Sequence, residues 1–156
     1  WVNRGTNDWR VAKSVLPPFG YLARNGGIET SIERVGGRVV EHSETAGESY
    51  FNPRLAPGAG GVEYEALRTA GALLLQKRDR HLNVIPLPDS AAFEVSLRLD
   101  RLLPAEVVNR PAPLKPIKVQ VVDAAGLRGE EIPAAANAWQ VTFTTRQGDF
   151  GYRLDY

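Results

Sequence analysis

The sequence predicts an all-β fold, an antiparallel β-sandwich of jelly-roll or immunoglobulin-like type with about ten short strands. Apolar and polar residues alternate with a period of two through most of the chain, whereas the helical period is nearly absent. Turn signals rich in glycine and proline separate the alternating runs at short intervals, which is typical of sandwiches and barrels. No internal repeat is visible, which argues against a propeller or a solenoid.

The clearest strands lie in the C-terminal half. Four alternating runs there each predict a half-buried strand: 93–100, 117–121, 139–145 and 150–155. The last two flank the turn 146–149, where Gly148 suits a positive φ, and they are predicted to pair as a closing hairpin. The apolar faces predict a core that includes Phe93, Leu97, Val119, Val121, Val141, Phe143 and Tyr152. Trp139 and Phe150 are also expected in that core.

The N-terminal half has the same alternation with stronger turn signals. Predicted strands occupy 9–16, 19–24, 28–35, 38–44, 62–68, 72–77 and 81–87. Residues 48–54 are expected to be extended or looped, and 56–61 to be a flexible connection. A proline-interrupted crossover with one short helical turn is expected over 99–116, and a long loop over 124–138.

Length and charge bound the possible partners. The 156 residues fit one domain, 1–156, and the start at Trp1 rather than Met indicates a piece excised from a longer multidomain protein. The net charge is +1 and no basic tract stands out, so nucleic acid and membrane surfaces are not expected partners. The longest apolar stretch is too short to span a bilayer. Cysteine is absent, which excludes disulfides and thiolate metal sites.

A metal site is the first chemical alternative. Gly36, His42, Glu44 and Glu48 have a spacing that resembles the first cupin motif, and strand alternation places His42 and Glu44 on one face. Glu44 stands where a second histidine is expected, and no second cupin motif is visible. The leading expectation is therefore no metal and no cofactor, and a small cupin-like, metal-dependent enzyme remains the alternative.

Other catalytic signatures are not distinguished. The 18 acidic residues provide many carboxylate pairs, but no pair is marked out for glycoside hydrolysis. The nucleophile motif G-x-S-x-G is absent, and the glycine-rich segment at 56–61 lacks the lysine of a phosphate-binding loop. We therefore expect no catalytic residue in this chain.

Aromatic residues provide the candidate binding site. Sugars present apolar C–H faces, so sugar sites use exposed aromatic rings beside polar side chains. Trp9, Tyr50 and Phe51 follow polar, turn-rich segments, and Asn52 and Arg54 are placed to add hydrogen bonds. These five residues are the predicted carbohydrate-binding set. The alternative is that the rings fasten loops to the sandwich or dock onto a neighbouring domain.

Three segments carry a family resemblance. The stretches VNRGTNDWRVAKSVLPPFGYL (2–22), GALLLQKRDRHLNVIPLPDS (71–90) and WQVTFTTRQGDFGYRL (139–154) resemble the accessory, non-catalytic β-sandwich regions of large bacterial glycoside hydrolases. The resemblance covers most of the chain in cadence rather than in strict motif. It implies a secreted or envelope-associated parent that acts on polysaccharide, with catalysis left to a separate barrel domain.

The first interpretation is accordingly a non-catalytic module of a carbohydrate-active protein. It would bind polysaccharide or oligosaccharide weakly, or support a neighbouring catalytic domain of the same chain. The second is a purely structural interaction module, and the third is the cupin-like enzyme.

Overall fold

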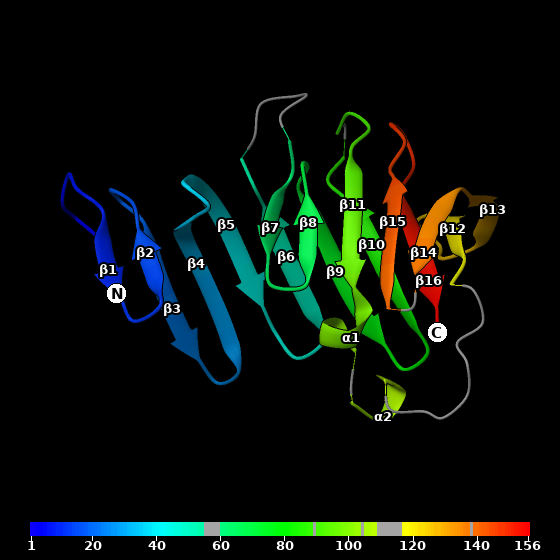
Figure 1. The fold of residues 1–156 in the computed structure, drawn as a ribbon, viewed down its shortest axis with the longest axis horizontal. Helices are drawn as coiled ribbons and strands as arrows, with labels where there is room; N and C mark the ends of the chain where they lie inside the picture. The colour runs from blue at the N-terminus through cyan, green and yellow to red at the C-terminus, as the bar shows by residue number, and fades with distance from the viewer. Residues whose placement is uncertain (55–59, 89, 104, 109–116, 138) are drawn as a thin grey trace.

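The computed structural model describes residues 1–54, 60–88, 90–103, 105–108, 117–137 and 139–156. These residues form 16 β-strands in three antiparallel sheets, and two helices of four residues each (Figure 1). The two larger sheets pack face to face, which confirms the all-β sandwich that the period-two alternation predicts. Within the described residues, no helix has the length and apolar character needed to cross a membrane.

The larger sheet has nine strands in the order β13-β12-β16-β10-β9-β6-β5-β4-β3. Its strands are β3 (Tyr21–Asn25), β4 (Ile28–Val35), β5 (Arg38–Glu44), β6 (Glu48–Asn52), β9 (Leu73–Arg78), β10 (His81–Pro86), β12 (Val119–Val122), β13 (Arg128–Ile132) and β16 (Gly151–Asp155). The predicted meander through 19–44 is confirmed as β3, β4 and β5, which are joined by tight turns. Gly26 (φ 55°) and Gly36 (φ 55°) take positive φ values in those turns.

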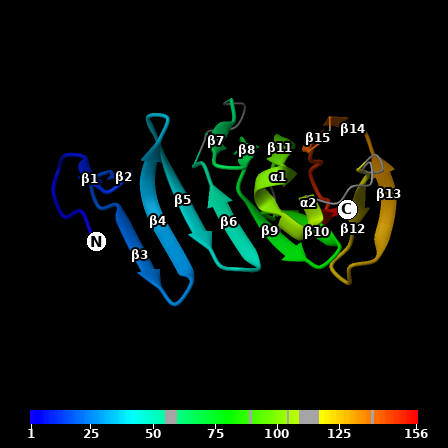
Figure 2. The same ribbon diagram turned by 60° about the horizontal axis from the view of Figure 1, so that its bottom comes forward.

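The smaller sheet has five strands in the order β14-β15-β11-β8-β7. Its strands are β7 (Val62–Tyr64), β8 (Leu67–Thr69), β11 (Glu94–Arg98), β14 (Ala134–Asn137) and β15 (Gln140–Thr144). Helices α1 (Leu99–Leu102) and α2 (Ala105–Val108) follow β11 at one end of the sandwich, which comes forward in Figure 2. The expected helical turn within 99–116 is therefore present, and 109–116 lie outside the described residues.

The core lies where the smaller sheet covers the larger one. Buried side chains of β8, β11 and β15 pack against those of β5, β6, β9, β10, β12 and β16. Strands β3 and β4 extend beyond this cover (Figure 1). There the hairpin of β1 (Trp9–Val11) and β2 (Ser14–Leu16) packs against β4, and it buries Leu16 completely. The larger sheet therefore has a well-covered half and a more open end.

Three predicted elements need correction. The expected strand 9–16 is the hairpin β1–β2, which turns at Ala12 (φ 53°), and the expected strand 62–68 is the pair β7 and β8, which turns at Glu65 (φ 51°). Neither turn contains the glycine that usually marks a positive φ. The expected loop 124–138 contains β13 and β14, whose mostly exposed residues hide the alternation.

The predicted closing hairpin is wrong. Strand β15 pairs with β11 and β14 in the smaller sheet, whereas β16 pairs with β10 and β12 in the larger sheet. The turn between them, with Gly148 at φ 90°, carries the chain from one sheet to the other. Alternation cannot separate these cases, because a strand buries one face whether its sequence neighbour lies beside it or across the core.

The predicted core is largely confirmed. Leu97, Val119, Val141, Phe143 and Tyr152 are buried, while Phe93, Val121 and Trp139 are half-buried against the same cluster. Phe150 is the exception, because it lies in the turn before β16 with its side chain exposed.

Candidate functional site

In four neighbouring strands of the larger sheet, the inward-facing side chains change from apolar to polar towards the same end. Residues paired across antiparallel strands share a face, so the register identifies the side chains that point towards the smaller sheet. These inward residues run from apolar to polar: Val35, Glu33, Ser31 and Glu29 on β4; Val40, His42 and Glu44 on β5; Phe51 and Ser49 on β6; Leu73, Leu75 and Lys77 on β9. The inner face of these strands is therefore apolar except at this end, which we call the polar end.

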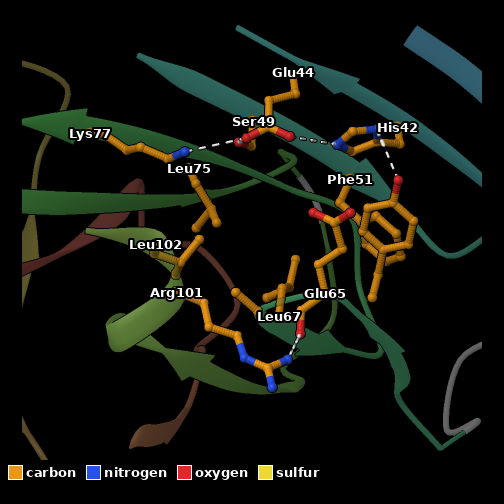
Figure 3. A pocket seen from close by; sticks show the side chains of 12 residues that line it. His42, Glu44, Ser49, Phe51, Glu65, Leu67, Leu75, Lys77, Arg101 and Leu102 are labelled. Atoms are coloured by element: carbon orange, nitrogen blue, oxygen red, sulfur yellow. Dashed lines mark hydrogen bonds and ion pairs between the residues drawn. The ribbon is translucent and has the colours of Figure 1, made fainter. Parts of the chain in front are cut away.

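This polar end forms a pocket with a volume of about 290 Å³ (Figure 3). His42, Glu44, Ser49 and Lys77 line one side, together with Leu75. The other side is formed by the β7–β8 turn and by α1, with Glu65, Leu67, Arg101 and Leu102. Charged and hydroxyl groups therefore face one cavity together with leucine side chains.

A chain of hydrogen bonds forms the buried wall of the pocket. The Tyr64 hydroxyl donates to Glu33 Oε1 at 3.2 Å and lies 3.3 Å from His42 Nδ1. The Ser31 hydroxyl donates to the same Glu33 oxygen at 3.1 Å. The Tyr64 ring also packs between His42 and Phe51, with centroid distances of 4.7 and 5.1 Å. Glu33 and His42 are buried, at 6% and 4% exposure, so this network is part of the folded interior.

Tyr64 keeps its proton in this environment. Burial, followed by the nearby charge of Glu33, raises the pKa of the Tyr64 hydroxyl well above its usual range. Both causes oppose the formation of a second negative charge beside a carboxylate. The hydroxyl is therefore available as a hydrogen-bond donor to Glu33 at all ordinary pH values.

Glu44 lies at the mouth of the pocket. Its Oε1 atom is 3.3 Å from Lys77 Nζ and accepts a hydrogen bond from Ser49 at 3.4 Å. Its Oε2 atom is 3.8 Å from His42 Nε2. Across the pocket, Arg101 donates to the Glu65 carbonyl at 3.4 Å. Lys77 and Glu44 thus lie close to one another, and the lining contains two basic residues, Lys77 and Arg101, and two acidic ones, Glu44 and Glu65, so the site has no large excess of either charge.

A second hollow continues the pocket across the turns at the strand ends of the larger sheet. It has a volume of about 590 Å³ and lies between the β3–β4 turn and the β5–β6 turn. Arg24 and Glu29, whose Nε and Oε2 atoms are 2.6 Å apart, line it. Glu44 and Lys77 belong to both hollows. We call the two together the open-end groove.

The structure confirms that His42 and Glu44 share a face, as their spacing predicts. Within the described ranges, however, no group of three or more His, Cys, Asp or Glu side chains is arranged to hold a metal ion. Lys77 beside Glu44 also places a positive charge where a cation would have to bind. The described residues thus place His42 and Glu44 on one face, as the cupin-like alternative requires, but they do not supply further ligands for a metal ion beside them.

The predicted carbohydrate-binding residues do not form one surface. Strand β1, which contains Trp9, lies at the end of the molecule (Figure 1), and Trp9 is 44% exposed; Tyr50 is half-buried on the outward face of β6, opposite to that of Phe51. Phe51 points the opposite way and is 2% exposed, so the expectation of an exposed ring there is wrong. Its burial follows from alternation, which places adjacent residues of one strand on opposite faces.

Asn52 and Arg54 are engaged locally. The Asn52 side chain accepts a hydrogen bond from the Arg54 backbone at 2.8 Å, in a turn where Arg54 has φ 51°. The Arg54 guanidinium lies 3.3 Å from Glu41 on the outward face. The contacts of these two side chains are thus with the chain itself, at the end of β6.

Sequence reasoning missed Glu33, Ser49, Tyr64 and Lys77. Glu33 and Lys77 carried a detectable signal, because each is a charged residue at an inward position of an alternating run. Tyr64 had no such signal, since its strand is only three residues long. The site could have been found from polar residues that occupy inward positions in several strands, provided that the pairing of those strands was known.

The chain matches no protein-family model, no curated protein and no solved structure. The functional interpretation therefore depends on the geometry of the open-end groove and on the resemblance described above.

Proposed function

We propose that this chain is a non-catalytic β-sandwich module of a carbohydrate-active protein, and that it binds glycan weakly in the open-end groove. The observation that supports this most is the composition of the pocket wall. Donors and acceptors line both sides of it: Lys77, Glu44 and Ser49 lie on one side with the apolar side chain of Leu75, and Arg101 lies on the other.

A saccharide has the complementary chemistry. Its hydroxyl groups both donate and accept, so they can bind a carboxylate and an ammonium group at the same time. Its C–H faces can pack on leucine and phenylalanine side chains. Because Lys77 and Glu44 are 3.3 Å apart, their charges offset one another. A neutral, polyhydroxylated ligand suits such a site better than an ion of either sign.

The size of the pocket predicts a weak interaction. Small-molecule sites usually enclose about 300–1,000 Å³, so the pocket of about 290 Å³ is at the lower limit. After the entropic cost of association, we expect affinities in the millimolar to high-micromolar range, about −4 to −6 kcal/mol. Such an affinity suits a module that acts beside a catalytic domain on a polymeric substrate.

The remaining parts of the proposal follow from the sequence resemblance. They are a neighbouring catalytic domain of the same chain as partner and an extracellular or cell-envelope location. Trp9 and Tyr50 remain candidates for outer contacts with a longer glycan, because both rings retain accessible surface.

Affinity electrophoresis against a panel of soluble polysaccharides tests the proposal. Lys77→Ala should abolish the retardation on a glycan that the parent chain binds. Lys118→Ala is the matched control, because Lys118 forms a comparable pair with Glu131 at 2.6 Å outside the groove. Unchanged mobility of the parent chain on every glycan would overturn the proposal. Retardation that survives Lys77→Ala but not the combined Trp9→Ala and Tyr50→Ala change would move the site to the aromatic residues.

One observation favours the alternative of a structural interaction module. Trp1, Val2 and Phe19 are large apolar residues with exposed side chains near the N-terminal end, and Phe19 reaches 78% exposure. Phe19 also has a φ of 61°, and its backbone N–H is bound to the Asn3 carbonyl at 3.0 Å. A bulky residue held outwards in that conformation suits contact with another domain. Loss of domain association on Phe19→Ser, with glycan binding unchanged, would support this second role.

A further inference from the structure

We infer that the buried chain Glu33–Tyr64–His42 fixes the tautomer of His42, so that His42 Nε2 and Glu44 Oε2 form a pair of hydrogen-bond acceptors for two adjacent hydroxyl groups of a saccharide. This inference rests on the proposed function, because it names the ligand class of the same groove. It deepens that function from general sugar binding to selection of a vicinal diol.

The direction of the hydrogen bonds follows from the number of protons. A tyrosine hydroxyl has one proton and two lone pairs. The Tyr64 proton is donated to Glu33 Oε1, at 3.2 Å. The Tyr64 oxygen can then only accept from its other neighbour, which is His42 Nδ1 at 3.3 Å. Nδ1 must therefore carry the imidazole proton.

The consequence appears at the other ring nitrogen. A neutral imidazole has one donor and one acceptor, so a protonated Nδ1 leaves Nε2 as an acceptor. Glu44 Oε2 lies 3.8 Å from Nε2, beyond hydrogen-bond distance, and it is also an acceptor. The two atoms cannot satisfy one another, and both residues line the pocket.

The rest of Glu44 is already engaged. Lys77 and Ser49 lie at 3.3 and 3.4 Å from Oε1, which leaves Oε2 on the side of His42. Two neighbouring hydroxyl groups on one sugar ring can donate to Nε2 and to Oε2 at the same time. A sugar that lacks one of these hydroxyls leaves either Nε2 or Oε2 without a donor from the ligand, so it should bind more weakly than the complete diol.

The first experiment measures the tautomer without any ligand. Long-range ¹H–¹⁵N spectra of the histidine side chains at neutral pH should show His42 with a protonated Nδ1 and a bare Nε2. The chain has only one other histidine, His81, which serves as an internal reference. Tyr64→Phe should move His42 towards a mixture of tautomers and leave His81 unchanged. If Nε2 of His42 carries the proton in the unsubstituted chain, the inference is wrong, whatever tautomer the Tyr64→Phe variant shows.

The second experiment separates the inference from the proposed function. A methyl glycoside with an adjacent free hydroxyl pair is compared with its singly deoxygenated analogue, with His42 Nε2 as the reporter. The glycoside with both hydroxyls should shift the Nε2 resonance, and its deoxygenated analogue should bind about tenfold more weakly. Equal binding with an unmoved Nε2 would overturn the inference and leave sugar binding in place. No perturbation of the groove by any glycoside would overturn both, and a shift caused only by Zn²⁺ would assign the acceptor pair to a metal.

Discussion

The covered part of the larger sheet and its polar end are built from the same alternating strands, yet their inward side chains differ in chemistry. Strand β9 contains both regions: Leu73 lies in the core, Leu75 is buried and also lines the pocket, and Lys77, two residues on, faces the open-end groove. The comparison shows that alternation determines which residues point inward. The inward residues are apolar where the smaller sheet covers them and polar where they face the groove.

The polar end is stable because its buried groups have partners. A buried carboxylate without donors is strongly destabilising. Glu33 receives hydrogen bonds from Tyr64 and Ser31. Among the described residues, no fully buried side-chain polar atom is left without a hydrogen bond. The polar end therefore depends on a specific set of hydrogen bonds, whereas the covered half depends on volume and apolar area.

The largest effect is expected in the covered half. Phe143 is 3% exposed and its ring lies 5.2 Å from that of Tyr152. Phe143→Ala should lower the free energy of unfolding by about 3–5 kcal/mol, as large-to-small core changes do. Urea denaturation measures this value. Phe150→Ala, at an exposed turn position, is the matched control, and a loss below about 1 kcal/mol for Phe143→Ala would contradict the assignment of its face.

A smaller effect is expected at the polar end. Tyr64→Phe keeps the ring but removes the hydroxyl that joins Glu33 to His42. The expected loss is about 1–3 kcal/mol, the usual penalty for a buried polar group deprived of its partner. Tyr21→Phe, which removes a hydroxyl placed 3.2 Å from Thr30, provides the control and should have the weaker effect. If both variants unfold like the parent chain, the network is not a stabilising element.

The smallest effect concerns pH. Burial, followed by the charge of Arg153, lowers the pKa of His81 on the outward face of β10. In the unfolded chain the pKa of a His is about 6.5, so as the pH falls the unfolded chain binds a proton before the folded chain does. Stability should decrease below that pH, and His81→Gln should lose less stability between neutral and mildly acidic pH than the parent. Denaturation curves that change in parallel for the two proteins would argue against this linkage.

Much of the fold was predictable because alternation and turn signals are local. The glycines at 26–27 and 36–37 identified the meander of β3, β4 and β5. The exchange between sheets at 146–149 was not predictable, since β15 and β16 show the same alternation as a hairpin would. The division of 62–68 into β7 and β8 was missed because the turn depends on Glu65, a residue type that rarely adopts a positive φ.

The candidate site was less predictable than the fold. The sequence placed His42 and Glu44 on one face, but their partners come from β4, β9 and the β7–β8 turn, far apart along the chain. The choice of Phe51 as an exposed ring was wrong by one position on the strand, because exposure depends on which face the smaller sheet covers. Such contacts between distant segments have no local signal.

Backbone ¹H–¹⁵N spectra during titration with a glycan that retards the chain would test the central claim most directly. That claim is that the open-end groove is the ligand site. We expect the amide shifts to concentrate at the ends of β5 and β9, at the start of β6 and in the β7–β8 turn. Shifts confined to β1 or to the outward face of β6, with the groove amides unmoved, would contradict it.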